Sequence, residues 1–365
     1  MKIGILTFVR VESFGAIMQC YALSHYISTL GYEVEVIDYP LIPANYKKLY
    51  VYKFYSLFSV LKTLDIKGIC QKLKRKLIKT NSGACSDKSN MAVDFYDKNI
   101  PHSRMIVSDT DLTEYCRKYD AVIVGSDQVW NYVMSSRVDI YLLSFLNKSQ
   151  KKIAYAASFG VSSIPFLYKK VYRRYLSLFD FLSLREQKGC NLVKHLINKE
   201  SVQVLDPTLL LNAEQMDAVS AKCPDAPQQY VLVYDLLGSS YLMQYAHFIS
   251  SSKNIPIIDV GGYSVGQIIT LFKNASYVVT SSFHGTAFSI IFRKQFVSIC
   301  RKGRLTNSRI EDLLKLLHLE NSLLYEKVEK NADFKIIPVT YDKKFDEASQ
   351  NALILSKNFI NNALQ

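Results

Sequence analysis

The sequence lacks the patterns that mark a membrane-spanning protein or a secreted, disulfide-bonded one. Its 365 residues contain no uninterrupted apolar run long enough to cross a bilayer. The first apolar run is broken early by Arg10 and Glu12, so the N-terminus does not have the layout of a signal peptide. The seven cysteines form no CxxC pair and their number is odd, which argues against a disulfide framework. We therefore expect a cytoplasmic protein whose thiols are reduced and mostly buried.

Several ligand-binding signatures are missing as well. The chain has no G-x-G-x-x-G pattern, no P-loop pattern and no internal repeat at a fixed short period. We find no recognisable nucleic-acid-binding module, so the net charge of +13 does not predict a nucleic-acid partner. No spacing of His, Cys, Asp or Glu is typical of a metal site, and we expect neither a metal nor a cofactor.

The excess of positive charge is concentrated in one stretch of the chain. Residues 47–88 contain 11 Lys or Arg and two Asp, a net charge of +9, which leaves +4 for the rest of the chain. The stretch looks like one or two amphipathic basic helices, and two interpretations compete. It makes a peripheral contact with an anionic membrane at the inner face, or it is an insertion with a solvated basic face. Flotation of liposomes with and without residues 47–88 distinguishes them.

Segments with strand character alternate with helical segments along most of the chain, and this pattern predicts the fold. The strand KIGILTF, a helix that Gly31 stops and the strand EVEVIDY form a β-α-β unit. Two series of such units predict two Rossmann-like, doubly wound α/β domains facing each other across a cleft. We expect an N-terminal domain over 1–211 with a basic helical insertion at about 45–90, a C-terminal domain over 228–340, and a terminal helix over 341–365 that packs back on the N-terminal domain.

Polar side chains follow the predicted strands at their carboxyl ends, where ligands bind in open parallel sheets. AVIV runs into Gly125, Ser126 and Asp127; IAYAA runs into Ser158, Phe159 and Gly160; FLSL runs into Arg185; and YVVT runs into Ser281, Ser282, Phe283 and His284. Four strands would thus bring a carboxylate, a hydroxyl, a guanidinium and an imidazole to similar positions. The cleft between the domains is the default place for their ligand.

His284 is the sharpest candidate, because it stands where a buried strand meets an apolar helix. We expect that helix to begin near Gly285 or Thr286, so that its partial positive charge attracts an anion and lowers the pKa of the imidazole. A histidine there can donate a proton or bind an oxyanion. The alternative is a structural role, in which His284 caps the helix or fills a polar gap. The position of His284 alone gives the functional and the structural interpretation equal weight.

Arg185 and Asp127 each have a functional and a structural interpretation. A guanidinium directly after an apolar strand suits a carboxylate or phosphate, but Arg185 could equally pair with Glu186 or bridge the domains. For Asp127, a turn-stabilising or helix-capping role is the simpler interpretation.

Two predicted helix starts complete the set of candidates. The first helix opens at Ser13-Phe14-Gly15-Ala16, where backbone N–H groups could meet an anion. Ser308 and Glu311 have the spacing of a capping box, from which Arg309 would project, and a structural role is the simpler interpretation there. Spacing therefore predicts a two-domain α/β protein that binds a small anion in its cleft, without identifying the reaction.

The order of these segments resembles the polysaccharide pyruvyl transferase family. The matching stretches are GILTF, FGAIMQCYALSHYISTLGYEVEVIDY, YDAVIVGSDQVWN, KKIAYAASFG, LSLREQKG, VLDPTLLL, ASYVVTSSFHGTAFSIIF and NSRIEDLLKLL. Together they span roughly residues 3–317, and GSDQVWN and SSFHGTAFS are specific in combination. The resemblance implies a glycosyltransferase-B-like fold with two Rossmann-like halves, in agreement with the strand pattern.

The resemblance also implies a reaction and roles for single residues. The pyruvyl group of phosphoenolpyruvate would move to a sugar of a cell-surface polysaccharide or its lipid-linked precursor, giving a pyruvate ketal and releasing phosphate. By similarity His284 matches the catalytic histidine and Arg185 a donor-binding arginine, and we assign Asp127 as the base. The other residues expected to bind substrate are Ser282, Phe283, Gly285, Thr286, Ser158, Gly15, Ser126 and Arg309.

Two other functions stay open at this point. A nucleotide-sugar-dependent glycosyltransferase of the same fold is the main alternative, because a fold does not fix a function. The products distinguish the two. A pyruvyl transferase consumes phosphoenolpyruvate and releases phosphate, whereas a glycosyltransferase releases a nucleoside diphosphate. A non-catalytic carbohydrate-binding relative would bind ligand without turnover.

Overall fold

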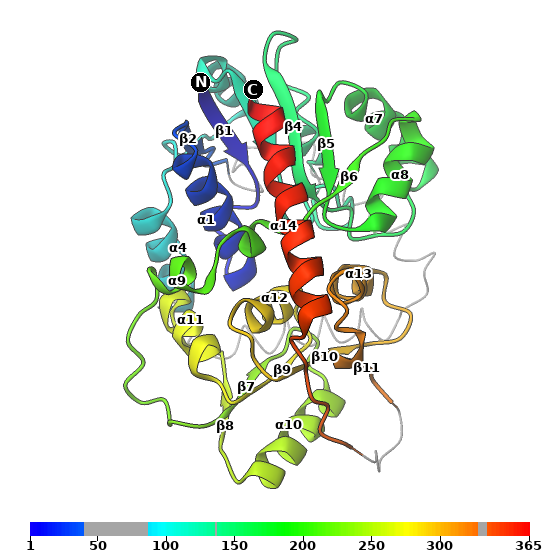
Figure 1. Ribbon diagram of the computed structural model, residues 1–365. Helices are drawn as coiled ribbons and strands as arrows, with labels where there is room; N and C mark the ends of the chain where they lie inside the picture. Colours follow the sequence, from blue (N-terminus) through cyan, green and yellow to red (C-terminus); the bar gives the residue numbers. More distant parts are fainter. Residues whose placement is uncertain (40–86, 136, 328–333) are drawn as a thin grey trace, which may run out of the picture.

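Two parallel β-sheets form the centres of two α/β domains in the computed structural model, which describes residues 1–39, 87–135, 137–327 and 334–365 (Figure 1). The sheet of the N-terminal domain lies in the upper half of Figure 1 and that of the C-terminal domain in the lower half. The predicted basic insertion at about 45–90, with the membrane contact expected of it, falls largely outside the described residues.

The N-terminal sheet has the strand order β2-β1-β3-β4-β5-β6, and all its strands are parallel. Its strands are β1 Lys2–Leu6, β2 Glu33–Val36, β3 Ala121–Val124, β4 Lys151–Ala157, β5 Phe181–Leu184 and β6 Val202–Gln203. All four residues of β3, AVIV, are buried. Near-continuous apolar runs of this kind are typical of parallel strands covered by helices on both faces.

The helices of this domain follow its strands. They are α1 Phe14–Thr29, α4 Asp87–Asn99, α5 Asp109–Tyr115, α6 Val138–Tyr141, α7 Phe166–Leu176, α8 Gln187–Ile197 and, at the boundary between the domains, α9 Ala213–Asp217. The Ser13 hydroxyl caps α1 by accepting a hydrogen bond from Ala16 N. Gly31 follows the end of α1 with φ +85°, a conformation that glycine adopts without steric cost, so the predicted stop is confirmed.

The C-terminal sheet repeats the same topology. Its order is β11-β10-β9-β7-β8, again all parallel, with strands β7 Val231–Tyr234, β8 Ile257–Asp259, β9 Tyr277–Thr280, β10 Phe296–Cys300 and β11 Leu323–Tyr325. Counted within its own domain, each sheet has the order 2-1-3-4-5, and the N-terminal one adds a sixth strand. The chain changes direction between β1 and β3 and between β7 and β9, and ligands bind beyond the strands at such switch points.

Helix α14 connects the two domains along one side of the molecule (Figure 1). The helices that follow the C-terminal strands are α10 Ser240–Lys253, α11 Val265–Asn274, α12 Phe283–Ile291, α13 Ser308–Leu316 and α14 Lys343–Leu364. Near its start, α14 pairs Asp346 with Arg293 of the C-terminal domain. Further along, the Ser356 hydroxyl accepts a hydrogen bond of 2.9 Å from Leu205 N, and Leu364 O accepts one of 3.3 Å from the Tyr32 hydroxyl.

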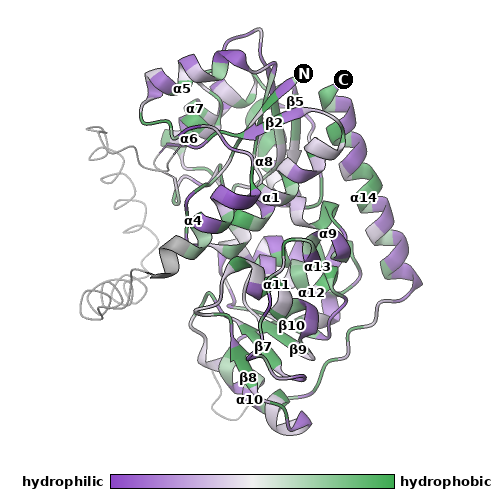
Figure 2. Ribbon diagram, turned by 90° about the vertical axis from the view of Figure 1, so that its left-hand side faces the viewer, coloured by the Kyte–Doolittle hydropathy of each residue, from purple (hydrophilic) through white to green (hydrophobic). Residues whose placement is uncertain are grey.

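The structure confirms the predicted fold class, since both sheets are parallel and doubly wound. In the view of Figure 2, apolar colour marks β7, β9 and β10, and polar colour marks much of α14, which lies on the outside. Of the described cysteines, Cys20, Cys116, Cys190 and Cys300 are buried and Cys223 is partly buried, all of them free, as expected. The short strand β11 and helix α9 were not among the predicted elements.

Two predicted helix starts are wrong. Helix α12 begins at Phe283, with Ser282 as its N-cap, so His284 lies within the first turn and does not precede the helix. Helix α13 begins at Ser308, and the residue before it caps without a side-chain hydrogen bond, so the predicted capping box does not form. The Glu311 carboxylate instead accepts a hydrogen bond of 2.7 Å from the Tyr325 hydroxyl, because β11 lies next to this helix.

Candidate active site

The carboxyl ends of strands from both domains meet at one buried cluster of charged side chains. Strand β3 leads into Ser126 and Asp127, β5 into Arg185 and β6 into Asp206, while β9 leads into the first turn of α12 and His284. Of these, Ser126, Arg185, Asp206 and His284 are buried. The cluster thus lies beyond the strands at the switch points of the two sheets, where the sequence predicts a ligand.

Asp206 joins the side chains that the N-terminal strands contribute. Its Oδ2 accepts hydrogen bonds from Arg185 Nη1 at 2.7 Å and from Ser126 Oγ at 2.9 Å, and its Oδ1 accepts from Thr208 N and Oγ1 at 3.1 and 2.8 Å. Burial acts to raise the pKa of Asp206, but Arg185 and His284 outweigh it and hold the pKa below its ordinary value. Asp206 is therefore a fixed negative charge that orients its neighbours.

Arg185 is held between two carboxylates. Besides its bond to Asp206, its Nη2 donates to Asp127 Oδ1 at 3.3 Å. Burial acts to lower the pKa of Arg185, but the charges of Asp206, Asp127 and Glu186 raise it above its ordinary value, so the guanidinium stays charged. Asp127 itself has φ +65°, and its Oδ1 also accepts from Gln128 N at 2.8 Å. Asp127 therefore stabilises the turn through Gln128 N and also contacts the cluster through Arg185.

His284 faces the same carboxylate from the other domain. Its Nε2 lies 3.8 Å from Asp206 Oδ2, too far for a hydrogen bond. Burial lowers the pKa of His284, and Asp206 and Asp127 offset this only in part, so the imidazole is neutral at neutral pH. Its ring packs against the backbone of Gly15 in α1, where an added Cβ would lie 1.9 Å from Nδ1. Only glycine fits at this contact between the domains.

Phe283 and Arg309 complete the half of the cluster that the C-terminal domain contributes. The Phe283 ring centroid lies 4.4 Å from Arg185 Cζ and 6.0 Å from Arg309 Cζ, so one aromatic ring lies near both guanidinium groups. Burial, together with Arg185, lowers the pKa of Arg309 to about 10. A second cation beside Arg185 is unfavourable unless an anion lies close to both.

Glu186 lies behind the cluster and was not among the predicted residues. Its Oε1 accepts hydrogen bonds from Ser158 Oγ at 2.9 Å and from Phe159 N at 3.0 Å. Burial raises its pKa above the ordinary value, against the opposing effect of Arg185. Ser158 therefore serves to position this carboxyl group in the described structure.

The cluster contains buried polar atoms that have no hydrogen-bond partner. Among the described residues seven buried side-chain nitrogen or oxygen atoms lack one, and four of them are Arg185 Nε, Glu186 Oε2, His284 Nε2 and Arg309 Nε. Buried polar atoms in folded proteins nearly always have partners. Because three of the four belong to cationic or proton-carrying groups, the arrangement suits a bound anion.

The remaining predicted site residues shape α12 and do not point polar atoms into the cluster. Ser282 N donates to Thr280 Oγ1 at 3.0 Å, and Thr286 Oγ1 donates to Ser282 O at 3.1 Å and lies 2.7 Å from Ser298 Oγ. An added Cβ on Gly285 would lie 2.2 Å from Thr280 Oγ1, so glycine lets α12 approach β9 closely. These residues hold the helix on which His284 lies.

Sequence reasoning missed Asp206 and Glu186, although a signal for each was present. Asp206 follows the strand segment VQVL, so the rule that located Asp127 and Arg185 applies to it equally. Glu186 was considered only as a partner of Arg185. Its bonds run instead to backbone and hydroxyl groups after β4, which only the folded arrangement shows.

A cavity of about 350 Å³ lies between the two domains. Ser162 and Lys188 line it from the N-terminal domain, and Lys302, Gly303, Arg304, Asn307, Glu311 and Tyr325 line it from the C-terminal domain. Lys188 follows Glu186 by two positions, and Asn307 and Glu311 flank Arg309. The cavity is therefore lined by Lys188, Lys302 and Arg304, and several of its residues are neighbours in sequence of cluster residues.

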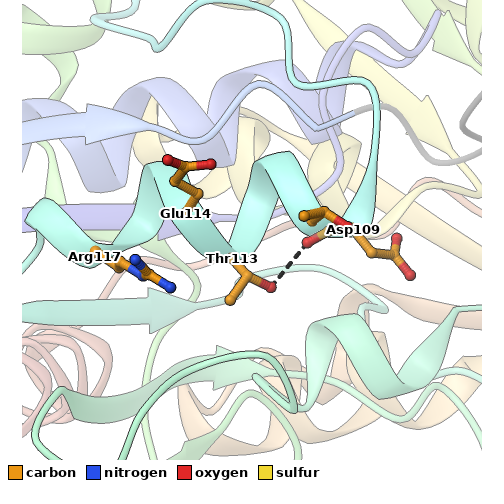
Figure 3. Close-up of a pocket in the computed structure, with 5 residues that line it drawn as sticks. Asp109, Thr113, Glu114 and Arg117 are labelled. Carbon is orange, nitrogen blue, oxygen red and sulfur yellow. Dashed lines mark hydrogen bonds between the residues drawn. The ribbon is translucent and has the colours of Figure 1, made fainter.

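A second cavity of about 300 Å³ lies elsewhere, on α5 and the turn after it (Figure 3). Asp109, Thr110, Thr113, Glu114 and Arg117 line it, and the Thr113 hydroxyl donates to Asp109 O at 2.8 Å. None of the predicted site residues takes part, and the C-terminal domain contributes nothing to its lining. We therefore take the buried cluster, with its partnerless atoms at the strand ends, as the candidate active site.

Two further searches of the described residues bear on what the site could hold. No group of three or more His, Cys, Asp or Glu side chains in this part of the chain is arranged to hold a metal ion. Within the same residues, no helix combines the length and the apolar character needed to span a membrane.

The fold and the site define a class of protein: two Rossmann-like domains with a buried, cation-lined centre between them. The family model described as polysaccharide pyruvyl transferase matches residues 14–300, and the chain belongs to the polysaccharide pyruvyl transferase family. The predicted resemblance is confirmed. No curated protein matches the chain.

Solved structures with a similar fold have low sequence identity to this chain. A UDP-GlcNAc 2-epimerase from Methanocaldococcus jannaschii is 11% identical, with a TM-score of 0.49, and the match covers 97% of this chain and 93% of that one. An alpha-glucosyltransferase bound to UDP and DNA is 8% identical, with a TM-score of 0.44 and coverage of 98% and 90%. MurG of Acinetobacter baumannii is 8% identical, with a TM-score of 0.43 and coverage of 100% and 94%. At this distance they say nothing about the substrate.

Proposed function

We propose that the protein transfers the pyruvyl group of phosphoenolpyruvate to a sugar of a cell-surface polysaccharide or of its lipid-linked precursor. The product is a pyruvate ketal, and phosphate leaves. The observation that carries the proposal is the set of partnerless nitrogen atoms on Arg185, His284 and Arg309 around one buried centre. Phosphoenolpyruvate is compact and strongly anionic, and it would supply the missing hydrogen-bond acceptors. Membership of the family supports a transferase.

The donor would bind between the two arginines and the start of α12. Asp206 and Asp127 each accept from one Nη atom of Arg185, and its Nε, which has no partner, is free to donate to a ligand. The N-cap of α12, Ser282, makes no side-chain capping bond, which leaves the first-turn N–H groups for an anion. The added negative charge would also offset the repulsion between Arg185 and Arg309.

Donor binding would recruit the catalytic proton. In the free protein the lowered pKa of His284 keeps its imidazole neutral at neutral pH. A bound dianion close to Nε2 favours the charged imidazolium, so the donor and a proton bind together. His284 then becomes a general acid only when the substrate is present.

The reaction balances with two hydroxyl groups and one donor. His284 gives its proton to the methylene carbon of phosphoenolpyruvate, whose double-bond electrons form the new C–H bond and leave an oxocarbenium-like C2. One sugar hydroxyl forms a C–O bond to C2 and passes its proton to Asp127. The C–O bond to phosphate then breaks, phosphate leaves with the electron pair, and the second hydroxyl closes the ketal. Asp127 passes the first hydroxyl proton to the departing phosphate, and the proton of the second hydroxyl restores His284.

The acceptor would approach through the basic cavity between the domains. The side chains of Lys302 and Arg304 form no hydrogen bond or ion pair with other described residues. Burial and the neighbouring Arg301 lower the pKa of Arg304, which indicates that nearby negative charge does not fully balance this guanidinium. A glycan attached through phosphate groups, as in a lipid-linked precursor, fits such a lining.

Mass spectrometry tests the proposal directly. The protein is incubated with phosphoenolpyruvate and extracted lipid-linked oligosaccharides, and the products are searched for a pyruvate ketal while inorganic phosphate is assayed. We expect the ketal and phosphate to appear in equal amounts. Arg185→Ala should weaken binding of the donor more than binding of the acceptor, and unchanged donor affinity would count against its role.

The alternative, a nucleotide-sugar-dependent glycosyltransferase, makes the opposite prediction in the same assay. It would leave phosphoenolpyruvate untouched and release a nucleoside diphosphate from a nucleotide sugar. Because each reaction releases a different product, one experiment with both donors present separates them.

A further inference from the structure

Large apolar side chains are exposed at the start of α7 and on the neighbouring loop. Phe166 is 84% exposed and Leu167 65%, and on the loop after β3 Met134 is 52% and Val133 51% exposed. The two segments are neighbours, because the rings of Tyr132 and Tyr168 lie 5.0 Å apart. Large apolar side chains grouped in this way on a surface mark a contact site more often than isolated ones do.

The same helix is strongly basic. Its sequence, FLYKKVYRRYL, contains Lys169, Lys170, Arg173 and Arg174 and no acidic residue. No described carboxylate forms an ion pair with any of the four; Arg173 donates to the backbone oxygen of Leu196 instead. We call the surface formed by Val133, Met134, Phe166, Leu167 and these four cations the α7 face.

The residues of the α7 face follow the carboxyl ends of β3 and β4, the end of the N-terminal sheet at which the cluster lies. The loop with Val133 and Met134 continues directly from Asp127, and α7 follows the segment that begins at Ser158. Between Ser158 and α7 lies Ser162, which lines the basic cavity between the domains. A partner on the α7 face would therefore lie close to the proposed approach of the acceptor.

We propose that the α7 face docks on an anionic lipid bilayer. Phe166 and Leu167 would enter the interface between headgroups and acyl chains, and the four cations would meet anionic headgroups, as in other peripheral anchors. Charge argues against two other occupants. A second copy packed face to face would set the basic helices against each other, and residues 47–88 carry a net charge of +9 themselves.

Flotation with vesicles tests the α7 face. The full chain is mixed with vesicles of equal parts phosphatidylglycerol and phosphatidylcholine, or with phosphatidylcholine alone, without donor or acceptor. We expect binding to the anionic vesicles only. Phe166→Ser with Leu167→Ser should lower the partition coefficient at least about tenfold. Lys169→Gln, Lys170→Gln and Arg174→Gln together should lower it about 100-fold, roughly fivefold for each cation.

A matched control separates this face from apolar exposure in general. Ile354 and Leu355 on α14 are 48% and 49% exposed, and replacing both by Ser should leave binding unchanged. Equal binding of the wild type and of both α7 variants would overturn the proposal, as would loss of binding only when the Lys and Arg residues of 47–88 are replaced by Gln. A concentration-dependent dimer that the α7 variants abolish, without vesicle binding, would overturn it too. Since no turnover is measured, the outcome is independent of the proposed reaction.

Discussion

The two halves of the active site are built on the same strand order but differ in how their polar groups are satisfied. In the N-terminal half, Asp206 ties Arg185, Ser126 and Thr208 into one hydrogen-bonded unit. Arg185 Nε and Glu186 Oε2 of this half still lack a partner in the described structure. In the C-terminal half, the side chains of His284 and Arg309 form no hydrogen bond with other described residues, and His284 Nε2 and Arg309 Nε are buried.

This difference indicates a division of labour. A network whose hydrogen bonds are made in the free protein holds its shape before substrate arrives, and such preorganisation is what a transition state requires. Buried nitrogen atoms without partners are costly in the free protein, and the cost is recovered when a ligand supplies acceptors. We therefore assign the network around Asp206 to positioning, and Arg185 Nε, His284 and Arg309 to binding the donor, with His284 also transferring the proton.

The largest effect is expected on the stability of the protein, when the hydrogen-bonded network around Asp206 is disrupted. Asp206→Ala leaves the buried Arg185 guanidinium without its main partner, and removal of one member of a buried ion pair costs about 3–5 kcal/mol. Chemical denaturation measures the free energy of unfolding. The control is Asp217→Ala, which removes a surface ion pair with Lys273 and should cost at most about 1 kcal/mol. Similar losses in the two variants would mean that Asp206 does not organise the site.

The second effect concerns turnover and not stability. His284→Asn removes the proposed acid while keeping a polar side chain of similar size, so the fold should persist and the rate should fall about 10²- to 10⁴-fold. The rate is measured as phosphate release, with circular dichroism as the check on folding. His247→Asn, an exposed change on α10, serves as the control. Normal turnover by His284→Asn would remove the imidazole from the mechanism.

The third effect tests the contact between the two halves. Gly15→Ala would bring a methyl group to within 1.9 Å of His284 Nδ1, so the ring must move, and a displacement of about 1 Å can cost about 10²-fold in rate. Gly31→Asn, where an added Cβ meets nothing within 4 Å, should keep full activity. Both rates come from the same phosphate assay. Full activity of Gly15→Ala would show that the position of the ring is not critical.

The smallest effect is a dependence of stability on pH. The pKa of His284 is lower in the folded protein than its ordinary value of about 6.5, so between the two values the unfolded chain binds more protons. The stabilisation is complete above about 6.5 and is lost as the pH falls toward the folded-state pKa. The stability of the wild type relative to His284→Asn should thus decline on acidification. Denaturation curves at several pH values measure it, and a constant difference would contradict the assigned shift.

The sequence predicts the fold and the location of the site better than the bonds within it. Apolar runs and the rule about carboxyl ends located Asp127, Arg185 and His284, because strand patterns are local in the sequence and a parallel sheet brings the carboxyl ends of its strands to one edge. The roles of Asp206 and Glu186 depend on contacts between strands far apart in the chain. The capping-box spacing favours a structural role for the motif of Arg309, which the resemblance nevertheless places among the substrate-binding residues, and the fold brings its guanidinium near the Phe283 ring.

The central claim is that phosphoenolpyruvate occupies the partnerless nitrogen atoms and brings a proton with it. Calorimetric titration of phosphoenolpyruvate at about pH 8, in two buffers of different ionisation enthalpy, counts the protons taken up on binding. We expect one site with net proton uptake in the wild type, no uptake in His284→Asn, and much weaker binding in Arg185→Ala. Absence of binding to the wild type, or identical binding and proton counts in all three proteins, would contradict the account.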